Sequence, residues 1–361
     1  MSSSNSAIDF VAKIQQPDIL LCVISGGASA LLCAPVPPLT LLEKQWIIKT
    51  LAARGAPIQD LNVVRSRLSE IKGGRLASHI SADVHWASLI LSDIIEDPIQ
   101  LIGGGPTVSG SFTNADAVSI AKAYDVWDSA PDHVREVLSR SDSTVASFPS
   151  TAANNILVGN NTVALHVCKQ TAIRLGYQVL VLTNRLQGNC TDAAKAFAAI
   201  VRSVNAYRSG QSTEPPTLSY FLTEGLSLPI VDWNLPVCVL TGGETTVAVT
   251  GQGKGGRNLE MALAFAVTLH ELSSRSKDSL KNFQGSFVSC GTDGQDNTDA
   301  AGATIVFPFS TATAEDFAYA EKSLRNNDSY TFFSDCQSFG SLITTGLTGT
   351  NIMDLQVLLM S

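Results

Sequence analysis

Membrane-spanning runs, signal-peptide features and paired cysteines are missing from this 361-residue chain. No apolar run is long enough to cross a bilayer, and the N-terminus lacks a basic region followed by an apolar core. The seven cysteines are odd in number, scattered and never spaced as C-x-x-C, which excludes a disulfide framework. We therefore expect reduced thiols and a cytoplasmic location, with a mitochondrial location left open for a longer parent form.

The chain also lacks an excess of positive charge. It carries 24 Lys and Arg against 32 Asp and Glu, for a net charge of −8 and a pI near 5.1. No basic stripe is visible, so nucleic acid is not an expected partner, and no membrane is expected either. An acidic chain that binds anionic ligands must do so locally, through glycine turns and a few placed cations.

Several catalytic patterns are absent as well. The five histidines lie apart, without the spacing of metal ligands. The G-x-S-x-G elbow of many hydrolases and the Walker-type phosphate loop do not occur. The chemistry must therefore come from other glycine turns, carboxylates and cations.

Apolar runs alternate with helical patterns along the first part of the chain. Its length predicts two domains, and a hydrophobic content of 45% allows a large core. The alternation predicts an α/β fold with a parallel sheet, whose ligands bind beyond the carboxyl ends of the strands. The predicted strands are 19–25, 84–93, 154–160 and 177–184, and the predicted helices are 40–53, 116–123, 131–138, 162–175 and 191–209.

A Ser-, Pro- and Thr-rich stretch at 208–221 interrupts this alternation. We predict a first α/β domain at 1–225 and a second, smaller α/β domain at 226–361. The second domain is expected to begin with a strand, a turn, another strand at 245–250 and a Gly-rich loop, followed by a strong helix from Asn258.

The stretch VISGGASALL, residues 23–32, has the pattern of a strand end, a glycine turn and a helix start. The first N–H groups of a helix are unpaired and lie at the positive end of its dipole, so they attract phosphate. Gly26 and Gly27 would let a phosphate approach the backbone, and Ser25 and Ser29 add hydroxyl donors. A tight turn without a ligand explains the same residues equally well.

A second glycine-rich segment, GQGKGGR, matches G-x-G-x-x-G through Gly251, Gly253 and Gly256. The match alone is weak evidence for a nicotinamide-dependent oxidoreductase, because no acidic residue follows at the usual interval. Lys254 and Arg257 favour a phosphoryl group instead, since a guanidinium can form a fork-like contact with phosphate oxygens. The alternative is a pair of solvated cations on a loop.

Carboxylates at strand ends are candidates for magnesium binding or for accepting a hydroxyl proton. Glu244 follows two glycines, Asp93 ends an apolar run, and Asp293 lies in the loop GTDGQDNTDAAGA. Asp296 and Asp299 in the same loop are equally explained by turn chemistry.

Two further polar segments are candidates for ligand binding. Lys72 lies in VRSRLSEIKGGRLA (64–77), where several cations and two glycines make an anion site plausible beside the simpler reading of a solvated basic face. Asn351 lies in LITTGLTGTNIMD (342–354), which we expect to form a polar lip at the cleft between the domains.

These motifs, taken in order, resemble those of one family. The segments are SGGASALLCAP, NVVRSRLSEIKGGRLA, LSDIIEDP, GGGPTV, TGGETTV, GKGGRNLEMAL, GTDGQDNTDAAGA and GTNIMD. The chain closely resembles glycerate kinases of the second class, the MOFRL family that includes animal D-glycerate kinases. The likeness runs from about Asp18 to the C-terminus, and the motifs are specific as a set.

The resemblance implies ATP-dependent, Mg²⁺-assisted phosphorylation of D-glycerate, usually at the 2-hydroxyl, in a cleft between the two domains. It implies a Rossmann-like larger domain and a smaller C-terminal α/β domain of MOFRL type. It also implies small-molecule partners and leaves a homodimer open, and it identifies Arg257 with the family's essential arginine in GGRN. The catalytic residues are then Arg257, Asp293 and Glu244. The residues expected to bind ATP are Ser25, Gly26, Gly27, Ser29, Lys72, Asp93, Gly253, Lys254, Gly255, Gly256 and Asn351, with Asp93 and Asp293 as magnesium ligands.

Two departures from the family pattern change the expectation. Ala28 stands where the family usually has a third glycine, and its methyl group would crowd a closely held backbone. Nothing before Ser25 matches the family's N-terminal segment with its essential lysine in a GKA-like motif. We therefore expect an N-terminally truncated form with an uncovered sheet edge or apolar face, and with impaired activity. A non-catalytic relative that binds nucleotide or glycerate is the alternative.

Overall fold

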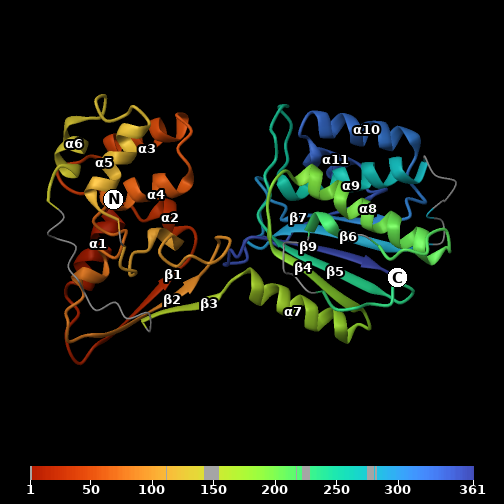
Figure 1. The fold of residues 1–361 in the computed structure, drawn as a ribbon, viewed down its shortest axis with the longest axis horizontal. Coiled ribbons are helices and arrows are strands. Elements are labelled where there is room, and N and C mark those ends of the chain that lie inside the picture. The colour runs from red at the N-terminus through yellow and green to blue at the C-terminus, as the bar shows by residue number, and fades with distance from the viewer. Residues whose placement is uncertain are drawn as a thin grey trace. The chain divides into compact units, whose positions relative to one another are not determined.

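The structure, a computed structural model, describes residues 2–110, 112–141, 154–216, 218–221, 228–274, 280 and 283–361. The chain divides into two compact units, Met1–Gly159 and Asn160–Ser361, drawn in red to yellow and in green to blue (Figure 1). Both units combine helices with a sheet, so the predicted α/β class is confirmed. No helix among these residues is long and apolar enough to cross a membrane.

The first unit contains a three-stranded sheet in the order β1-β2-β3, and both strand pairs are parallel. All three strands were predicted, and helical segments on the connections make the unit Rossmann-like. Its elements are α1 Ser2–Val11, β1 Ile19–Ile24, α2 Ala28–Leu31, α3 Leu41–Ala53, α4 Ile58–Arg67, the 3₁₀ turns Ala77–His79 and Ile102–Gly104, β2 His85–Leu91, α5 Asn114–Ala123, α6 Asp132–Leu138 and β3 Asn155–Gly159.

Local sequence explains where the helices of the first unit begin. Thr40 and Glu43 form a capping box at α3, and Thr113 and Asp116 form another at α5. Buried apolar side chains of α3, α4, α5 and α6 then pack into one helical core, of which Ile47 is a fully buried member. This core holds α4 in place, and α4 carries part of the site described below.

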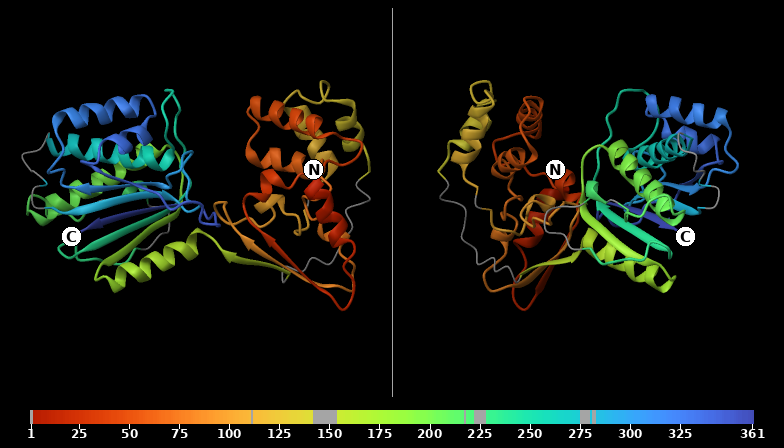
Figure 2. Two further views of the ribbon diagram at one scale, coloured as in Figure 1. Left: turned by 180° about the vertical axis from the view of Figure 1, so that it is seen from behind. Right: turned by 45° about the vertical axis from the view of Figure 1, so that its right-hand side comes forward.

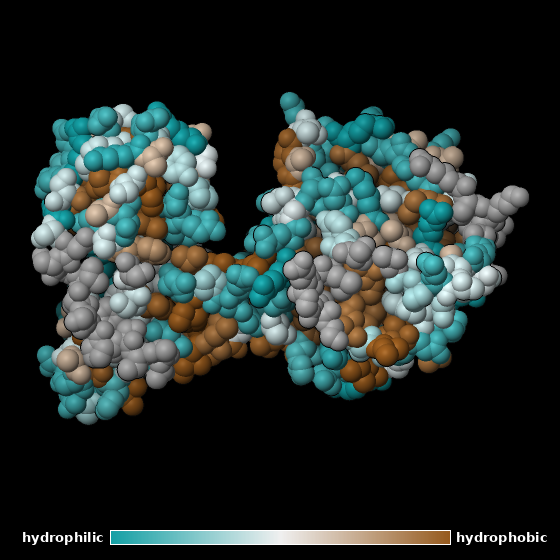
Figure 3. Space-filling model, viewed as in Figure 1, coloured by the Kyte–Doolittle hydropathy of each residue, from teal (hydrophilic) through white to brown (hydrophobic). Residues whose placement is uncertain are grey.

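One face of the first sheet leaves apolar side chains in solvent. Ile19 and Val23 of β1 are 79% and 73% exposed, and Leu21 between them is also exposed. The residues between these three turn the other way, in the alternation of an extended strand. Figure 3 shows hydrophobic side chains gathered along the strands of this unit.

The second unit is built on a six-stranded sheet in the order β4-β5-β9-β6-β7-β8. The pair β4–β5 is parallel and the other pairs are antiparallel. Its elements are α7 Asn161–Arg174, β4 Gln178–Leu186, α8 Cys190–Arg208, the 3₁₀ turn Ser219–Phe221, β5 Val237–Gly243, α9 Arg257–Ser274, β6 Gly285–Gly291, β7 Gly302–Phe307, α10 Ala314–Arg325, α11 Ser329–Asp335, β8 Gly340–Ile343 and β9 Asp354–Met360.

Helices cover both faces of the second sheet (Figures 1 and 2). Helices α8 and α9 lie over one face, where Phe197, Phe265 and Phe287 join the main core. Helix α7 lies against the other face through Leu165, which packs with Leu240 of β5. Every residue of β5 is buried as a result, as expected for a strand covered on both sides.

Two sequence predictions differ from the structure in this unit. The segment 160–225 belongs to the second compact unit, because β4 pairs with β5, whereas the predicted division lay at 225/226. The strand expected at 245–250 is wrong: only Thr246 forms an isolated bridge there, with Asn189. The amides of this segment bond elsewhere, since Thr246 N donates to Gly188 O and Thr250 N donates to the side chain of Asn327.

Candidate functional site

The glycine turn of the first unit has the predicted strand–turn–helix order. β1 ends at Ile24, and α2 is a single helical turn. A Cβ placed on Gly26 would lie 1.7 Å from Asp93 Oδ2, so glycine is required for the Asp93 carboxyl to approach. Gly27 has only Leu31 Cδ1 near such a position, at 3.9 Å, so the backbone there is open.

Asp93 is the electrostatic centre of this turn. Burial raises the pKa of its carboxyl group. Its Oδ1 atom is buried and has no hydrogen-bond partner among the described residues. A buried carboxylate oxygen without a donor is costly, so a cation or a donor from a ligand would stabilise it.

Lys72 does not lie on a solvated face. It is buried, and its Nζ donates to three carbonyls: Ala28 O at 3.4 Å, Ser29 O at 3.0 Å and Gly103 O at 3.0 Å. Burial, together with the nearby charge of Arg65, lowers the pKa of Lys72 to about 8, while Cys33 opposes this shift. The ammonium therefore ties α2 to the run Gly103–Gly105, where all three glycines have positive φ.

A cavity of about 440 Å³ adjoins this lysine within the first unit. It is lined by Ser29, Asn62, Arg65, Ser66, Lys72, Gly73, Ile99, Gln100, Leu101, Gly104, Val108, Ser109, Gly110 and Phe112. Two predicted site residues, Ser29 and Lys72, thus share a hollow with α4, and no carboxylate lines it.

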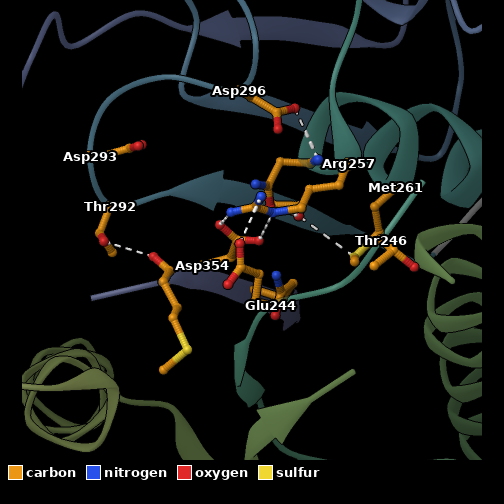
Figure 4. Close-up of polar contacts among 12 residues, drawn as sticks. Glu244, Thr246, Arg257, Met261, Thr292, Asp293, Asp296 and Asp354 are labelled. Atoms are coloured by element: carbon orange, nitrogen blue, oxygen red, sulfur yellow. Dashed lines mark hydrogen bonds and ion pairs between the residues drawn. The ribbon is translucent and has the colours of Figure 1, made fainter. Parts of the chain in front are cut away.

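In the second unit, Arg257 begins α9 and lies among carboxylates (Figure 4). Its Nε and Nη2 donate to Asp354 Oδ2 at 2.6 Å and Oδ1 at 2.9 Å, and its Nη1 lies 3.0 Å from Glu244 Oε1. Asp354 is 0% exposed, whereas Arg257 and Glu244 are 32% and 46% exposed. Burial works to lower the pKa of Arg257, but the hydrogen bonds and charge of Asp354, aided by Glu244, raise it above its ordinary value.

Asp296 caps the helix that Arg257 begins. Its Oδ2 accepts from Asn258 N at 2.9 Å and Leu259 N at 2.8 Å, two of the unpaired amides at the start of α9. Burial raises the pKa of Asp296 to about 6, although the amide hydrogen bonds oppose this. A Cβ on Gly256 would lie 2.3 Å from Asp296 Cγ, so this glycine allows the cap to close. Of the two roles open for Asp296, the structure provides the structural one.

The other glycines of GQGKGG pack against the chain's own loop. A Cβ on Gly251 would lie 2.2 Å from Asn326 O, and one on Gly253 would lie 2.3 Å from Asp328 Cβ. Gly253 N donates to Asn326 O, and Gly255 faces Ser329, the first residue of α11. This packing accounts for the G-x-G-x-x-G pattern without a dinucleotide.

Lys254 in the same segment is also held by the chain. Its amide donates to Asp328 Oδ1 at 2.9 Å, and its Nζ lies 3.7 Å from the centre of the Tyr330 ring. A cation over an aromatic face is stabilised by the ring's quadrupole.

Asp293 and Asn351 lie at the ends of neighbouring strands. A Cβ on Gly291 would lie 3.0 Å from Asp293 Oδ1 and 3.5 Å from Asp354 Oδ1, so both carboxylates flank this glycine. Asp293 Oδ1 accepts from Gln295 N at 3.1 Å, and Asn351 Oδ1 accepts from Met353 N at 3.1 Å.

The predicted site residues therefore form two groups, one in each unit. The first consists of the turn Ser25–Ser29 with Lys72 and Asp93, and the second gathers Glu244, Arg257 and Asp293. No cluster of three His, Cys, Asp or Glu side chains with metal-ligand geometry occurs in the described ranges.

Asp354 was missed as a site residue, although the sequence carried a signal for it. It is an acid at the first position of the alternating strand DLQVLLM, where the odd positions are buried. A carboxylate at a buried position requires a charged partner. That rule alone would have directed attention to a nearby arginine.

Comparisons with known proteins agree on one group of relatives. A domain of unknown function, DUF4147, matches residues 1–139, and the MOFRL family matches residues 237–354. Glycerate kinase of Rattus norvegicus is 41% identical over 364 residues, covering 96% of this chain and 68% of the relative. Glycerate 2-kinase of Pyrococcus horikoshii is 30% identical, covering 98% of this chain and 73% of the relative. The crystal structure of a glycerate kinase from Thermotoga maritima matches with a TM-score of 0.77 at 28% identity, over 100% of this chain and 77% of the other.

Proposed function

This chain belongs to the glycerate kinase family, and we propose that it transfers the terminal phosphate of ATP to the 2-hydroxyl of D-glycerate. The relatives' names support the reaction and the acceptor, and the Pyrococcus relative's name supports the hydroxyl. Phosphoryl transfer needs little covalent chemistry from a protein, so positioned cations and acceptors are the features to look for.

The placement of Arg257 is the observation that carries the proposal. Asp354 accepts from Nε and Nη2 along one edge of the Arg257 guanidinium, which fixes the plane of the group before any ligand binds. Nη1, on the adjacent edge, faces Glu244, in a pair where both partners are partly exposed. Exposed pairs are weak, so a phosphoryl oxygen can replace Glu244 at this edge. The guanidinium would then offset the charge on the transferring group.

That exchange would separate Glu244 from Arg257 Nη1 and leave its carboxylate beside the transferring phosphate. A carboxylate beside the transferring phosphate can accept the proton that the acceptor hydroxyl loses. Asp293 lies near the same carboxylates, at the end of β6, and is the second acidic group proposed for this end of the reaction. The glycine turn at Ser25–Ser29 is proposed to receive the phosphates of ATP.

Magnesium fits the first group through Asp93. Its unpartnered buried oxygen is suited to a hard cation, and Mg²⁺ needs only one or two carboxylates because phosphates and waters complete its shell. Asp93 would hold the ion on the protein side. When bound, the ion would neutralise charge on the phosphates.

A coupled assay with ATP, Mg²⁺ and D-glycerate tests the proposal. We expect turnover in the wild type and a loss of at least about 100-fold in kcat for Arg257→Ala. Arg325→Ala is the matched control, because that arginine is 72% exposed and pairs with Glu321 on its own helix. Phosphorus NMR of the product separates 2-phosphoglycerate from 3-phosphoglycerate.

Three outcomes would contradict parts of the proposal. Equal activity of the wild type and Arg257→Ala would remove Arg257 from the reaction. A 3-phosphoglycerate product would overturn the assigned hydroxyl. Calorimetric binding of ATP without turnover would support the non-catalytic alternative instead.

A further inference from the structure

The cavity beside Lys72 has a chemical character of its own. Its lining residues carry two cations, Arg65 and Lys72, and no anion, although the whole chain is acidic. Small polar side chains and amides, including Ser66, Ser109 and Gln100, alternate with apolar walls. A hollow of this kind suits a small anion that also carries hydroxyl groups.

Arg65 is the cation in this cavity that remains available to a ligand. The hydrogen bonds of Lys72 go to three carbonyls, as described above. Arg65 makes a long hydrogen bond from Nη1 to Asn62 Oδ1 at 3.4 Å, and no carboxylate pairs with it among the described residues. Its neighbour Arg67 differs: that guanidinium is buried and donates to Asn114 Oδ1 at 2.8 Å.

A further buried cation, Lys44, interacts electrostatically with the two cations of this cavity. Lys44 of α3 is buried, and its Nζ has no hydrogen-bond partner within the described ranges. Burial lowers the pKa of Lys44 to about 8; the charges of Lys72, Arg75 and Arg65 act in the same direction, and Cys33 acts against them. Several cations thus face one another here, and an anion bound in the cavity would stabilise them.

We propose that this cavity binds the carboxylate of the phosphoryl acceptor and that Arg65 is the residue that contacts it. The inference rests on the proposed function for the identity of the acceptor. A guanidinium offers a flat pair of donors that matches one carboxylate. Ser29 of the glycine turn lines the same cavity, so the acceptor would lie beside the turn proposed for ATP phosphates.

A carboxylate fits better than the triphosphate of ATP. The triphosphate carries several negative charges, and only one cation in the cavity is available for new contacts. The serine hydroxyls and amides can hydrogen-bond the hydroxyl groups of a hydroxy acid, and Ile99 and Val108 can pack against its carbon chain.

Steady-state kinetics of Arg65→Gln and Arg65→Lys test this assignment. We expect the KM for D-glycerate to rise by about 10- to 100-fold in Arg65→Gln, with the KM for ATP within about twofold of the wild type. The preference for D-glycerate over its uncharged amide should fall by a similar factor. Arg65→Lys should lie between, because an ammonium keeps the charge but loses the paired geometry.

A matched arginine variant controls for a general loss of charge. Arg135→Gln removes an exposed guanidinium of α6 that pairs with Asp132, outside the cavity, and should leave both KM values unchanged. An unchanged KM for D-glycerate in Arg65→Gln would overturn the assignment, and so would an equal rise in the KM for ATP.

Binding without turnover separates this inference from the proposed function. If the wild type fails to phosphorylate D-glycerate, the proposed function fails, and calorimetry with D-glycerate, D-lactate and inorganic phosphate still decides the role of Arg65. Binding of both carboxylates that weakens about 10-fold or more in Arg65→Gln supports the cavity as a carboxylate site. Equal affinities in the two proteins, or Arg65-dependent binding of phosphate alone, contradict it.

Discussion

The two glycine-rich segments of this protein differ in what lies against their backbone. In the second unit, the glycines of 251–256 let two stretches of chain touch, and a methyl group at Gly251, Gly253 or Gly256 would meet atoms within 2.3 Å. In the first unit, Gly26 makes room for Asp93, but Gly27 faces open space, and their N–H groups donate to no described residue. One segment is closed by its own chain and the other is left open.

The difference shows why a glycine pattern alone is poor evidence for a ligand. Glycine permits close approach of any group to the backbone, whether it comes from a cofactor or from the protein. Residues that are distant in the sequence determine whether a ligand or the protein fills the space beside the glycines. Here, residues 326–329 pack against the segment 251–256. The open turn keeps the donors that a phosphate would use.

The largest loss of stability is expected from breaking the ion pair between Arg257, which follows the closed segment, and Asp354. Asp354→Asn removes the charge that faces Arg257 in a fully buried position, so we expect the free energy of unfolding to fall by about 3–5 kcal/mol. Urea denaturation followed by circular dichroism measures it. Asp132→Asn is the matched control: it breaks an exposed arginine pair in the first unit and should change stability by less than about 1 kcal/mol. Equal losses of stability in the two variants would show that the buried ion pair contributes no more than the exposed one.

Much of the fold could be predicted because its signals are local. The strands β1, β2, β3 and β4 are continuous apolar runs, and α8 follows from a helical pattern with its start at Asn189. Which sheet a strand joins is not local: β4 resembles the earlier strands in sequence, yet it pairs with β5 in the second sheet. The strand expected at 245–250 failed for the same reason, since distant groups bind its amides.

The candidate site also combines features that local sequence predicts with features that depend on distant segments. Arg257, Glu244 and Asp293 were chosen from strand ends and glycines, and the structure brings them together around Asp354. Lys72 was chosen as a cation in a basic segment, but its burial and its three carbonyl partners come from segments that the local sequence does not identify.

A glycine-to-alanine pair sharpens the comparison most directly. Gly256→Ala forces a methyl group against Asp296, so we expect a loss of about 1–3 kcal/mol in the free energy of unfolding. Gly27→Ala meets no atom closer than 3.9 Å at a negative φ, so its stability should stay within about 0.5 kcal/mol of the wild type. Urea denaturation gives both values.

The KM of Gly27→Ala for ATP then tests whether the open turn binds phosphate. If the turn receives phosphate, Gly27→Ala should raise the KM for ATP while the protein stays as stable as the wild type. A stable Gly27→Ala protein with an unchanged KM for ATP would show that the open turn is not a phosphate site.

The last prediction that compares the two units is a pH dependence of stability with opposite signs. Burial raises the pKa of Glu260 in the second unit from 4.5 to about 7, so the folded state binds more protons in this window and stability should fall as the pH rises through it. Burial lowers the pKa of Lys44 in the first unit from 10.5 to about 8, so the unfolded state binds more protons between these values and stability should rise with pH. Urea denaturation across pH 4.5–10.5 measures both slopes, and Glu260→Gln and Lys44→Met should flatten the acidic and the alkaline one respectively. A Lys44→Met protein that keeps the alkaline slope would show that this lysine is not the buried cation behind it.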